Sequence, residues 1–145
     1  MPAGDTEVPN EEVPVNLALN AKVKSSSENA GEPAIKAVDG KIENNSKWCT
    51  TTDMYGGWLE VDLGSEKTIQ RWRTMHGEAA GEDKETNTKA FRLQVLRNGQ
   101  FVDVDVVKDN EEGIVDRNLT EPVTGQVFRL YIDDPGPSPW KAIRI

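Results

Sequence analysis

The segment that most constrains the fold is residues 58–64, where apolar and acidic side chains alternate. The apolar residues fall on one face of an extended chain and the acidic residues on the other, with Leu59, Val61 and Leu63 against Glu60 and Asp62. This two-residue period predicts a β-strand with one face buried and one face in water. A turn rich in oxygen-bearing side chains precedes it, from Asp39-Gly40 to Ser46, and a hard cation such as Ca²⁺ prefers oxygen ligands.

Turn signals separate several further strand candidates along the chain. These candidates are residues 68–75, 91–96, 101–107, 127–132 and 142–145. Asn98-Gly99 is typical of a two-residue hairpin turn. One short helical turn is expected at 32–38, and the sequence contains no long helical pattern and no fixed-period repeat. Short strands joined by turns predict an all-β fold, an antiparallel β-sandwich.

Two of these strands carry a clear face pattern. Residues 101–107 are expected to place three valines on one face and two aspartates on the other, as Val102, Val104 and Val106 against Asp103 and Asp105. Residues 127–132 are expected to oppose Phe128, Leu130 and Ile132 to Arg129 and Tyr131. Each pattern provides an apolar face for a core between the layers of the sandwich.

The composition restricts the domain organisation and the class of partner. A chain of 145 residues with 36% hydrophobic and 29% charged residues fits one globular domain. Residues 1–14 contain three prolines and four acidic but no basic residues, so we interpret them as a linker and residues 15–145 as the domain. The net charge of −8 argues against nucleic acid and against an anionic membrane surface as partners.

Cysteine content and hydropathy bear on the compartment. Cys49 is the only cysteine, so the chain cannot form an intrachain disulfide, and we interpret it as a small apolar residue. No hydrophobic run reaches membrane-spanning length and no signal peptide is visible. Because there is no such run, we expect no membrane insertion. A module from the middle of a longer secreted protein would also lack a signal peptide.

Several motifs together resemble a known family. The string NLAL…SSS…AVDGKIENNSKW…GGWLEVDLG…TIQRW…FRLQVLRNG…VFRLYI…AIRI is similar to the discoidin-type (coagulation factor C-type) domains. Within that superfamily it most resembles the family 32 carbohydrate-binding modules, over residues 16–145. The resemblance implies a jelly roll of about eight strands in a monomeric module of a multidomain chain. It also implies a secreted or extracellular location and attachment to a glycoside hydrolase.

The resemblance also implies a structural Ca²⁺ beneath the first long loop. Its ligands would be the Lys36 carbonyl, the Asp39 carboxylate, a carbonyl from Lys41 or Asn44, and the hydroxyl and carbonyl of Ser46. Family members usually carry a glutamate ligand on a strand that follows the equivalent of residues 142–145. The alternative is that Asp39 only caps a turn with its side chain, as aspartate often does.

The loop at residues 75–89 is the candidate saccharide site. It is long and rich in glycine and alanine, and long loops on a rigid sheet often carry binding residues. The string HGEAAGE…NTKAF resembles a segment of many family 32 modules, which implies that four of its residues lie in or beside the ligand pocket. These residues are His76, Glu82, Asn87 and Lys89. Imidazole, carboxylate, amide and ammonium groups can bond to sugar hydroxyls, each of which both donates and accepts.

Each of these four residues also has a simpler interpretation. His76 could be a solvated loop histidine, and Glu82 could be one more surface acid. The Asn87 side chain could bond its own backbone in an Asx-turn. Lys89 could be a charge that faces solvent.

A saccharide site usually includes an aromatic ring, because the C–H face of a pyranose packs on a flat ring. Trp140 follows a proline-rich loop that cannot form a strand, and in galactose-binding relatives the loop before the last strand often provides an aromatic side chain. Trp140 is therefore either the platform or an anchor of this loop in the core. Tyr55 is a second candidate. The resemblance assigns Trp48 and Trp58 to the core, and Trp72 is expected to pack on a sheet face.

These observations predict a non-catalytic carbohydrate-binding module for terminal hexoses, with galactose, GalNAc or GlcNAc as ligand. The sequence contains no nucleophile motif, and Glu78 and Glu82 share a loop too flexible to hold a catalytic carboxylate pair. The alternative is a discoidin-type adhesion or protein-interaction domain in which the same loops contact a protein instead of a sugar.

Overall fold

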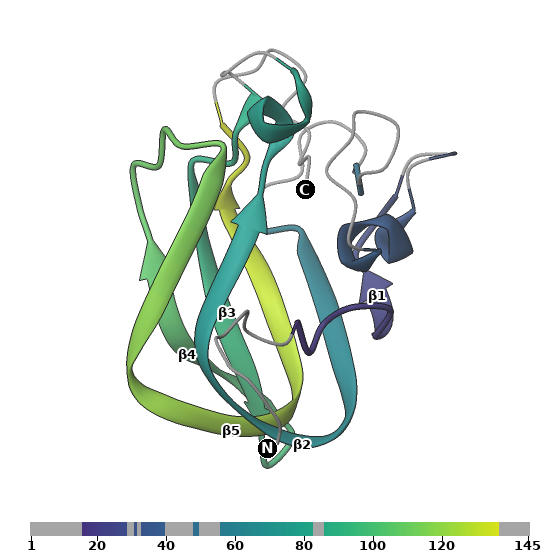
Figure 1. Ribbon diagram of the computed structural model, residues 1–145, viewed down its shortest axis with the longest axis vertical. Coiled ribbons are helices and arrows are strands. Elements are labelled where there is room, and N and C mark those ends of the chain that lie inside the picture. The colour runs from purple at the N-terminus through teal and green to yellow at the C-terminus, as the bar shows by residue number, and fades with distance from the viewer. Residues whose placement is uncertain are drawn as a thin grey trace, which may run out of the picture.

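The computed structural model describes residues 16–28, 31, 33–39, 48–49, 56–82 and 86–136. Its regular elements are five β-strands and two 3₁₀ helices (Figure 1). They are β1 (Lys22–Ser25), η1 (Ala34–Val38), β2 (Trp58–Met75), η2 (Gly77–Ala80), β3 (Ala90–Arg97), β4 (Gln100–Val107) and β5 (Ile114–Asp134). The predicted all-β fold class is confirmed. The linker at 1–14 and the strand expected at 142–145 lie outside the described residues.

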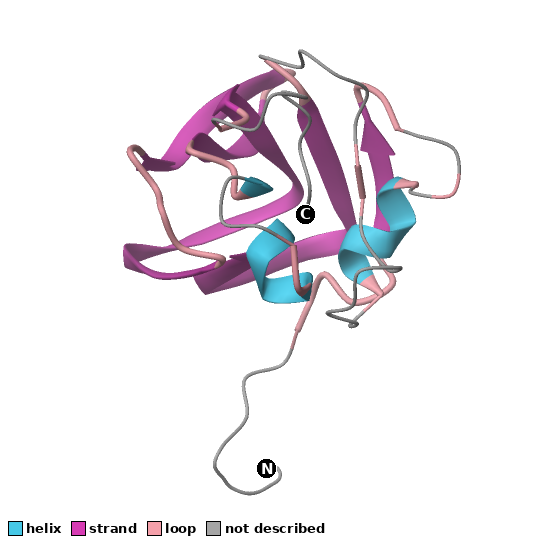
Figure 2. Ribbon diagram, turned by 90° about the horizontal axis from the view of Figure 1, so that it is seen from above, coloured by secondary structure: helices cyan, strands magenta, loops and turns pink. Residues whose placement is uncertain are grey.

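The five strands form one antiparallel sheet in the order β1-β2-β5-β3-β4. The two longest, β2 and β5, contain 18 and 21 residues, and both bend at the lower end of Figure 1. The first half of β2 pairs with the second half of β5, and the second half of β2 pairs with the first half of β5. The bends therefore fold one sheet into two layers, which Figure 2 shows from above. This arrangement is the predicted β-sandwich.

The long strands explain why the described residues contain five strands instead of about eight. The candidates at 58–63 and 68–75 are the two halves of β2, with an irregular register between Asp62 and Lys67. The candidate at 127–132 is the second half of β5, whose first half carries no regular alternation of apolar residues. β1 was not predicted either, because Lys22–Ser25 contains a single apolar residue. The expected helical turn at 32–38 is η1.

The core lies between the two layers. The second half of β2 and the first half of β5 form one layer and contribute Trp72, Val115 and Leu119. The opposite layer contributes Leu59, Phe91, Leu93, Val95, Phe128, Leu130 and Ile132. Trp72 packs edge-on against Phe91, with ring centroids 5.9 Å apart. Trp48 and Cys49 are also buried. The expected positions of Trp48 and Trp72 and the face pattern of residues 127–132 are confirmed.

Trp58 does not lie in the core, contrary to the prediction from the sequence. Its side chain is half-buried, while the next residue, Leu59, is 4% exposed. Side chains alternate along a strand, so an inward Leu59 directs Trp58 to the outer face with Glu60. β2 therefore begins with Trp58 on the outer face, and Leu59 is its first residue that faces the core.

The face pattern predicted for β4 was wrong because the strand contains a bulge. Its register with β3 shifts between Leu93 and Gln94, so Asp105 pairs with Leu93 and Asp103 pairs with Gln94. One extra residue reverses the faces. Asp105 therefore lies on the core side and Asp103 on the outer side. Val104 packs against the core, whereas Val102 and Val106 are 49% and 38% exposed.

Asp105 connects the two layers of the sandwich. Its carboxylate accepts a hydrogen bond of 2.9 Å from Trp72 Nε1 and two hydrogen bonds, of 3.0 and 2.8 Å, from Arg117. The hydrogen bonds from Arg117 are the largest cause of the lowered pKa of Asp105. This carboxylate thus joins edge strand β4 to the second half of β2 and the first half of β5.

We expect Asp105→Ala to lower the free energy of unfolding by about 2 kcal/mol, because the buried Trp72 N–H loses its acceptor. Asp103→Ala is the matched control on the same strand. Asp103 is 44% exposed and contacts Arg92 and Gln94 on the outer face, so its loss should cost less than about 1 kcal/mol. Urea unfolding measures both, and equal losses would contradict the opposite placement of these aspartates.

Candidate functional site

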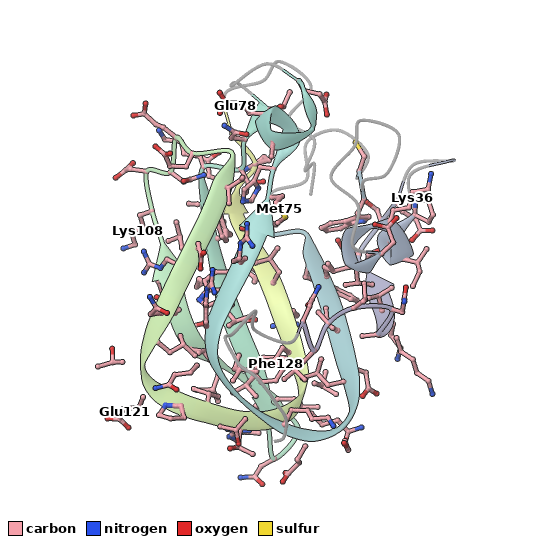
Figure 3. The ribbon with its side chains drawn as sticks, viewed as in Figure 1. Lys36, Met75, Glu78, Lys108, Glu121 and Phe128 are labelled. Carbon is pink, nitrogen blue, oxygen red and sulfur yellow. The ribbon has the colours of Figure 1, made fainter. Side chains whose placement is uncertain are left out.

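Residues 76–82 and 86–89 of the loop between β2 and β3 lie at the upper end of the sandwich in Figure 1, with η2 above the strand ends. Figure 3 shows Glu78 at this end, just above Met75, the last residue of β2. The β4–β5 loop, residues 108–113, reaches the same end. We refer to the described residues of this loop, 76–82 and 86–89, as the binding loop, after the function that the sequence predicts for it.

Two glycines shape the binding loop. A Cβ added to Gly77 would meet the Thr86 side chain, lying 2.8 Å from its Cβ and still closer to its Oγ1, so only glycine allows this approach. Gly81 ends η2 with φ 96° and donates its N–H to the carbonyls of Gly77 and Glu78. A left-handed residue at this position is typical of glycine. These glycines turn the chain back over the strand ends.

His76 is buried, which excludes the alternative of a solvated loop histidine. It is 2% exposed, and its ring lies 5.0 Å from the Phe91 ring. Its backbone N–H donates to the Gly113 carbonyl at 2.7 Å, and Nε2 forms a 2.8 Å hydrogen bond with Thr74 Oγ1. Among the residues that the structure describes, Nδ1 has no hydrogen-bond partner. Burial lowers the pKa of His76 from 6.5 to about 4, so the imidazole is neutral at physiological pH.

Asn87 is also buried, and its side chain bonds other segments instead of its own backbone. Its Oδ1 accepts from the Glu78 N–H at 3.0 Å. Its Nδ2 donates to Glu78 Oε1 at 2.9 Å and to the Glu111 carbonyl at 3.5 Å. The Asx-turn alternative is therefore wrong. Asn87 joins the start of η2 to the β4–β5 loop.

Glu82 and Lys89 fix the rest of the binding loop through their backbones. The Glu82 N–H donates to the Gly77 carbonyl at 3.0 Å, and the half-buried Glu82 side chain lies beside Gly77. The Lys89 N–H donates to the Asp134 carbonyl at 3.0 Å. The structure thus gathers His76, Glu82 and Asn87 around η2 and places half-buried Lys89 at the entry to β3. Tyr55 and Trp140 lie outside the described residues.

Sequence reasoning missed the β4–β5 loop as part of this site. Asn110 donates through Nδ2 to the Thr88 carbonyl at 2.9 Å and to the Glu112 carbonyl at 3.0 Å. Its backbone N–H donates to the Lys89 carbonyl at 2.8 Å. The run Asp109-Asn110-Glu111-Glu112-Gly113 signals a turn, but only the tertiary structure shows which loop it contacts.

Two of the candidate calcium ligands lie in the described residues. Lys36 is in η1, and Asp39 follows the helix with φ −92° and ψ 0°. Residues three apart share a side of a 3₁₀ helix, so this spacing fits a carbonyl and a carboxylate bound to one ion. Lys41, Asn44 and Ser46 lie outside the described residues. Within the described part of the chain, no group of three or more His, Cys, Asp or Glu could hold a metal ion.

None of the helices in the described residues is long and apolar enough to cross a membrane.

Solved structures resemble this chain over most of its length. The family 32 carbohydrate-binding module of Streptococcus pneumoniae EndoD is 30% identical, with 90% of this chain and 94% of that chain covered and a TM-score of 0.80. Chitosan-binding module 2 of a Paenibacillus sp. IK-5 chitosanase/glucanase, solved with chitotriose, is 22% identical, covers 88% and 95%, and has a TM-score of 0.72. The family 32 module of C. perfringens NanJ, solved with galactose, is 17% identical, covers 86% and 89%, and has a TM-score of 0.72.

The last two structures, at under 25% identity, support the fold alone. Comparison with curated proteins found no match. Residues 22–144 match the F5/8 type C domain family, which is more than half of the chain. The chain therefore belongs to the F5/8 type C domain family, and its likeness to the EndoD module places it among the family 32 carbohydrate-binding modules.

Proposed function

We propose that the protein is a non-catalytic module that binds terminal hexoses, with galactose, GalNAc or GlcNAc as the ligand. The observation that carries this proposal is the buried, neutral His76, whose Nδ1 has no hydrogen-bond partner within the binding loop. A buried polar atom without a partner costs about 1–3 kcal/mol. Nδ1 is covered in the unliganded protein, and a sugar hydroxyl that displaces the covering groups would supply the missing partner. The galactose bound by the NanJ module is consistent with such a ligand.

The hydrogen bond between Thr74 Oγ1 and His76 Nε2 lets Nδ1 either donate to a sugar hydroxyl or accept from it. The hydroxyl of Thr74 can donate to Nε2 or accept from it. A neutral imidazole carries one proton, so Nδ1 accepts when Nε2 donates and donates when Nε2 accepts. The pair can therefore match either role of a sugar hydroxyl without becoming charged.

The expected affinity indicates how such a module is used. A hexose has about 12 heavy atoms, and about 0.3 kcal/mol per atom gives a Kd of order mM. Weak sites of this kind become effective on a tethered module, because linked sites raise avidity by about 10²–10⁴-fold. We therefore propose that the module is part of a secreted glycoside hydrolase and directs it to glycans outside the cell.

We expect His76→Ala to weaken binding of the preferred hexose by at least about tenfold, because a buried hydrogen bond is worth about 1.4 kcal/mol. Trp140→Ala should also weaken binding if its ring stacks on the sugar. Titration calorimetry with galactose, GalNAc and GlcNAc measures the loss. Undiminished binding in both variants would exclude this site.

A glycan array separates this function from a protein-interaction role. A sugar-binding module should give hits with terminal hexoses. An adhesion or protein-interaction domain built on the same loops should give none.

We also propose that Ca²⁺ stabilises the fold. Its ligands would be the Lys36 carbonyl, the Asp39 carboxylate and oxygen atoms of the loop that follows. At a Ca²⁺ concentration of 100 Kd the ion would contribute about 2.7 kcal/mol. A chelator should then lower the Tm by about 5–10 °C. Asp39→Ala is the control, since its Tm should no longer respond to the chelator. An unchanged Tm in the unmodified protein would contradict the calcium site.

A further inference from the structure

Two asparagine side chains join the binding loop to the β4–β5 loop. Asn87 contacts Glu78 and Glu111, and Asn110 contacts Thr88 and Glu112. Asn87 is 3% exposed. Two of these contacts, Asn87 with Glu111 and Asn110 with Thr88, join residues 24 and 22 positions apart in the chain, so they fix one loop relative to the other.

The amide of Asn87 has no donor left for a ligand. A primary amide carries two N–H groups, and both point to acceptors in the protein, Glu78 Oε1 and the Glu111 carbonyl. Its Oδ1 accepts from the Glu78 N–H. A sugar hydroxyl could use these donors only by breaking contacts that hold η2 in place.

Asn110 uses its side chain in the same way from the opposite loop. Nδ2 donates to the carbonyls of Thr88 and Glu112, and Oδ1 accepts from the Glu112 N–H at 3.1 Å. Its backbone N–H donates a hydrogen bond to the Lys89 carbonyl. The β4–β5 loop is thereby closed on itself and attached to the end of the binding loop.

The same β4–β5 loop also holds the start of the binding loop. The Gly113 carbonyl accepts from the His76 N–H at 2.7 Å. A Cβ on Gly113 would lie 3.1 Å from the Ala79 nitrogen and from Glu78 Cβ, so η2 packs directly on this loop. His76, η2 and Lys89 therefore all depend on residues 110–113 for their position.

We propose that Asn87 and Asn110 are positioning residues that hold His76 in the orientation that binds sugar, and that the β4–β5 loop therefore sets the affinity of the site. This inference rests on the proposed function. A loop that is already ordered loses less conformational freedom when a ligand binds. Without these contacts, only a fraction of the molecules would present His76 correctly, and the apparent affinity would fall by that fraction.

The test compares Asn110→Ala and Asn87→Asp with a control variant. Asn87→Asp keeps the shape and the acceptor of the amide but directs a second oxygen at the Glu78 carboxylate. The control is Thr124→Ala, which removes the 2.6 Å hydrogen bond between Thr68 and Thr124. Thr124 lies in the bend of β5, three residues after Glu121, which Figure 3 shows at the end opposite Glu78.

Two measurements are made on each protein. NMR titration with galactose, GalNAc and GlcNAc gives the Kd, and amide hydrogen exchange gives the local stability at His76 and Glu78. We expect Asn110→Ala and Asn87→Asp to raise the Kd about tenfold and to accelerate exchange at these two amides. Thr124→Ala should leave the Kd within about twofold and exchange at both amides unchanged.

Two results would overturn the inference. A Kd within twofold of the unmodified protein in both asparagine variants would show that the contacts do not set affinity. Unchanged exchange at His76 and Glu78 would show that the asparagines do not hold the loop. If the unmodified protein binds none of the three sugars, the proposed function fails together with the effect on affinity. The exchange measurement still decides whether the loop is held.

Discussion

Replacing Phe91 by alanine is expected to lower the free energy of unfolding by about 3–5 kcal/mol, the usual cost of removing a fully buried phenylalanine. Phe91 is 0% exposed and lies at the start of β3, where its ring contacts both Trp72 and His76. The cavity would thus open between the core and the binding loop. Urea unfolding followed by tryptophan fluorescence measures the loss.

Two variants control this prediction. Phe91→Leu retains most of the buried volume and should cost less than about 1.5 kcal/mol. Phe101→Ala removes the same ring from the half-buried outer face of β4, where it lies under Arg129 at 3.9 Å, and should cost about 1 kcal/mol. A loss in Phe91→Ala no larger than in Phe101→Ala would contradict the central position of Phe91.

Lowering the pH from 7 to 4 is expected to reduce the free energy of unfolding by up to about 3 kcal/mol through His76 alone. Burial lowers its pKa to about 4 in the folded protein, whereas the unfolded chain keeps a pKa of about 6.5. Between these values the unfolded chain binds a proton that the folded protein does not. Stability is therefore greatest above pH 6.5 and falls as the pH decreases to about 4.

Three aspartates affect the free energy of unfolding in a separate, more acidic pH range. Hydrogen bonds from Gln94, Arg117 and Arg71 are the largest causes of the lowered pKa of Asp103, Asp105 and Asp116, respectively. The stability that these carboxylates contribute is complete above their ordinary pKa of 3.8 and is lost as the pH falls below it.

The effect of His76 can be separated from that of the aspartates with His76→Gln, which keeps a polar side chain but cannot titrate. Urea unfolding at several pH values should show a flatter profile for this variant between pH 6.5 and pH 4, and the same decline as the unmodified protein below that range. Identical slopes in both proteins between pH 6.5 and pH 4 would show that His76 is not the group responsible.

The sequence marked residues 75–89 as a candidate site, but it could not predict the contacts that these residues make. The length and glycine content of residues 75–89 marked the loop, and the resemblance to family 32 modules selected His76, Glu82, Asn87 and Lys89. The burial of His76 against Phe91 and the contacts of Asn87 with Glu78 depend on side chains that meet only after the strands have paired. Asn110 carries no sequence signal beyond that of a turn.

Local patterns were enough to predict the all-β class. They are the alternation in residues 58–63 and 127–132 and the turn at Asn98-Gly99, where both residues have positive φ. The bends that carry β2 and β5 through both layers, and the bulge that places Asp105 inside and Asp103 outside, became visible only once the strands were paired. A period-two pattern depends only on neighbouring residues, whereas register depends on the partner strand. A shift of one residue exchanges the buried and exposed faces without any change in the pattern itself.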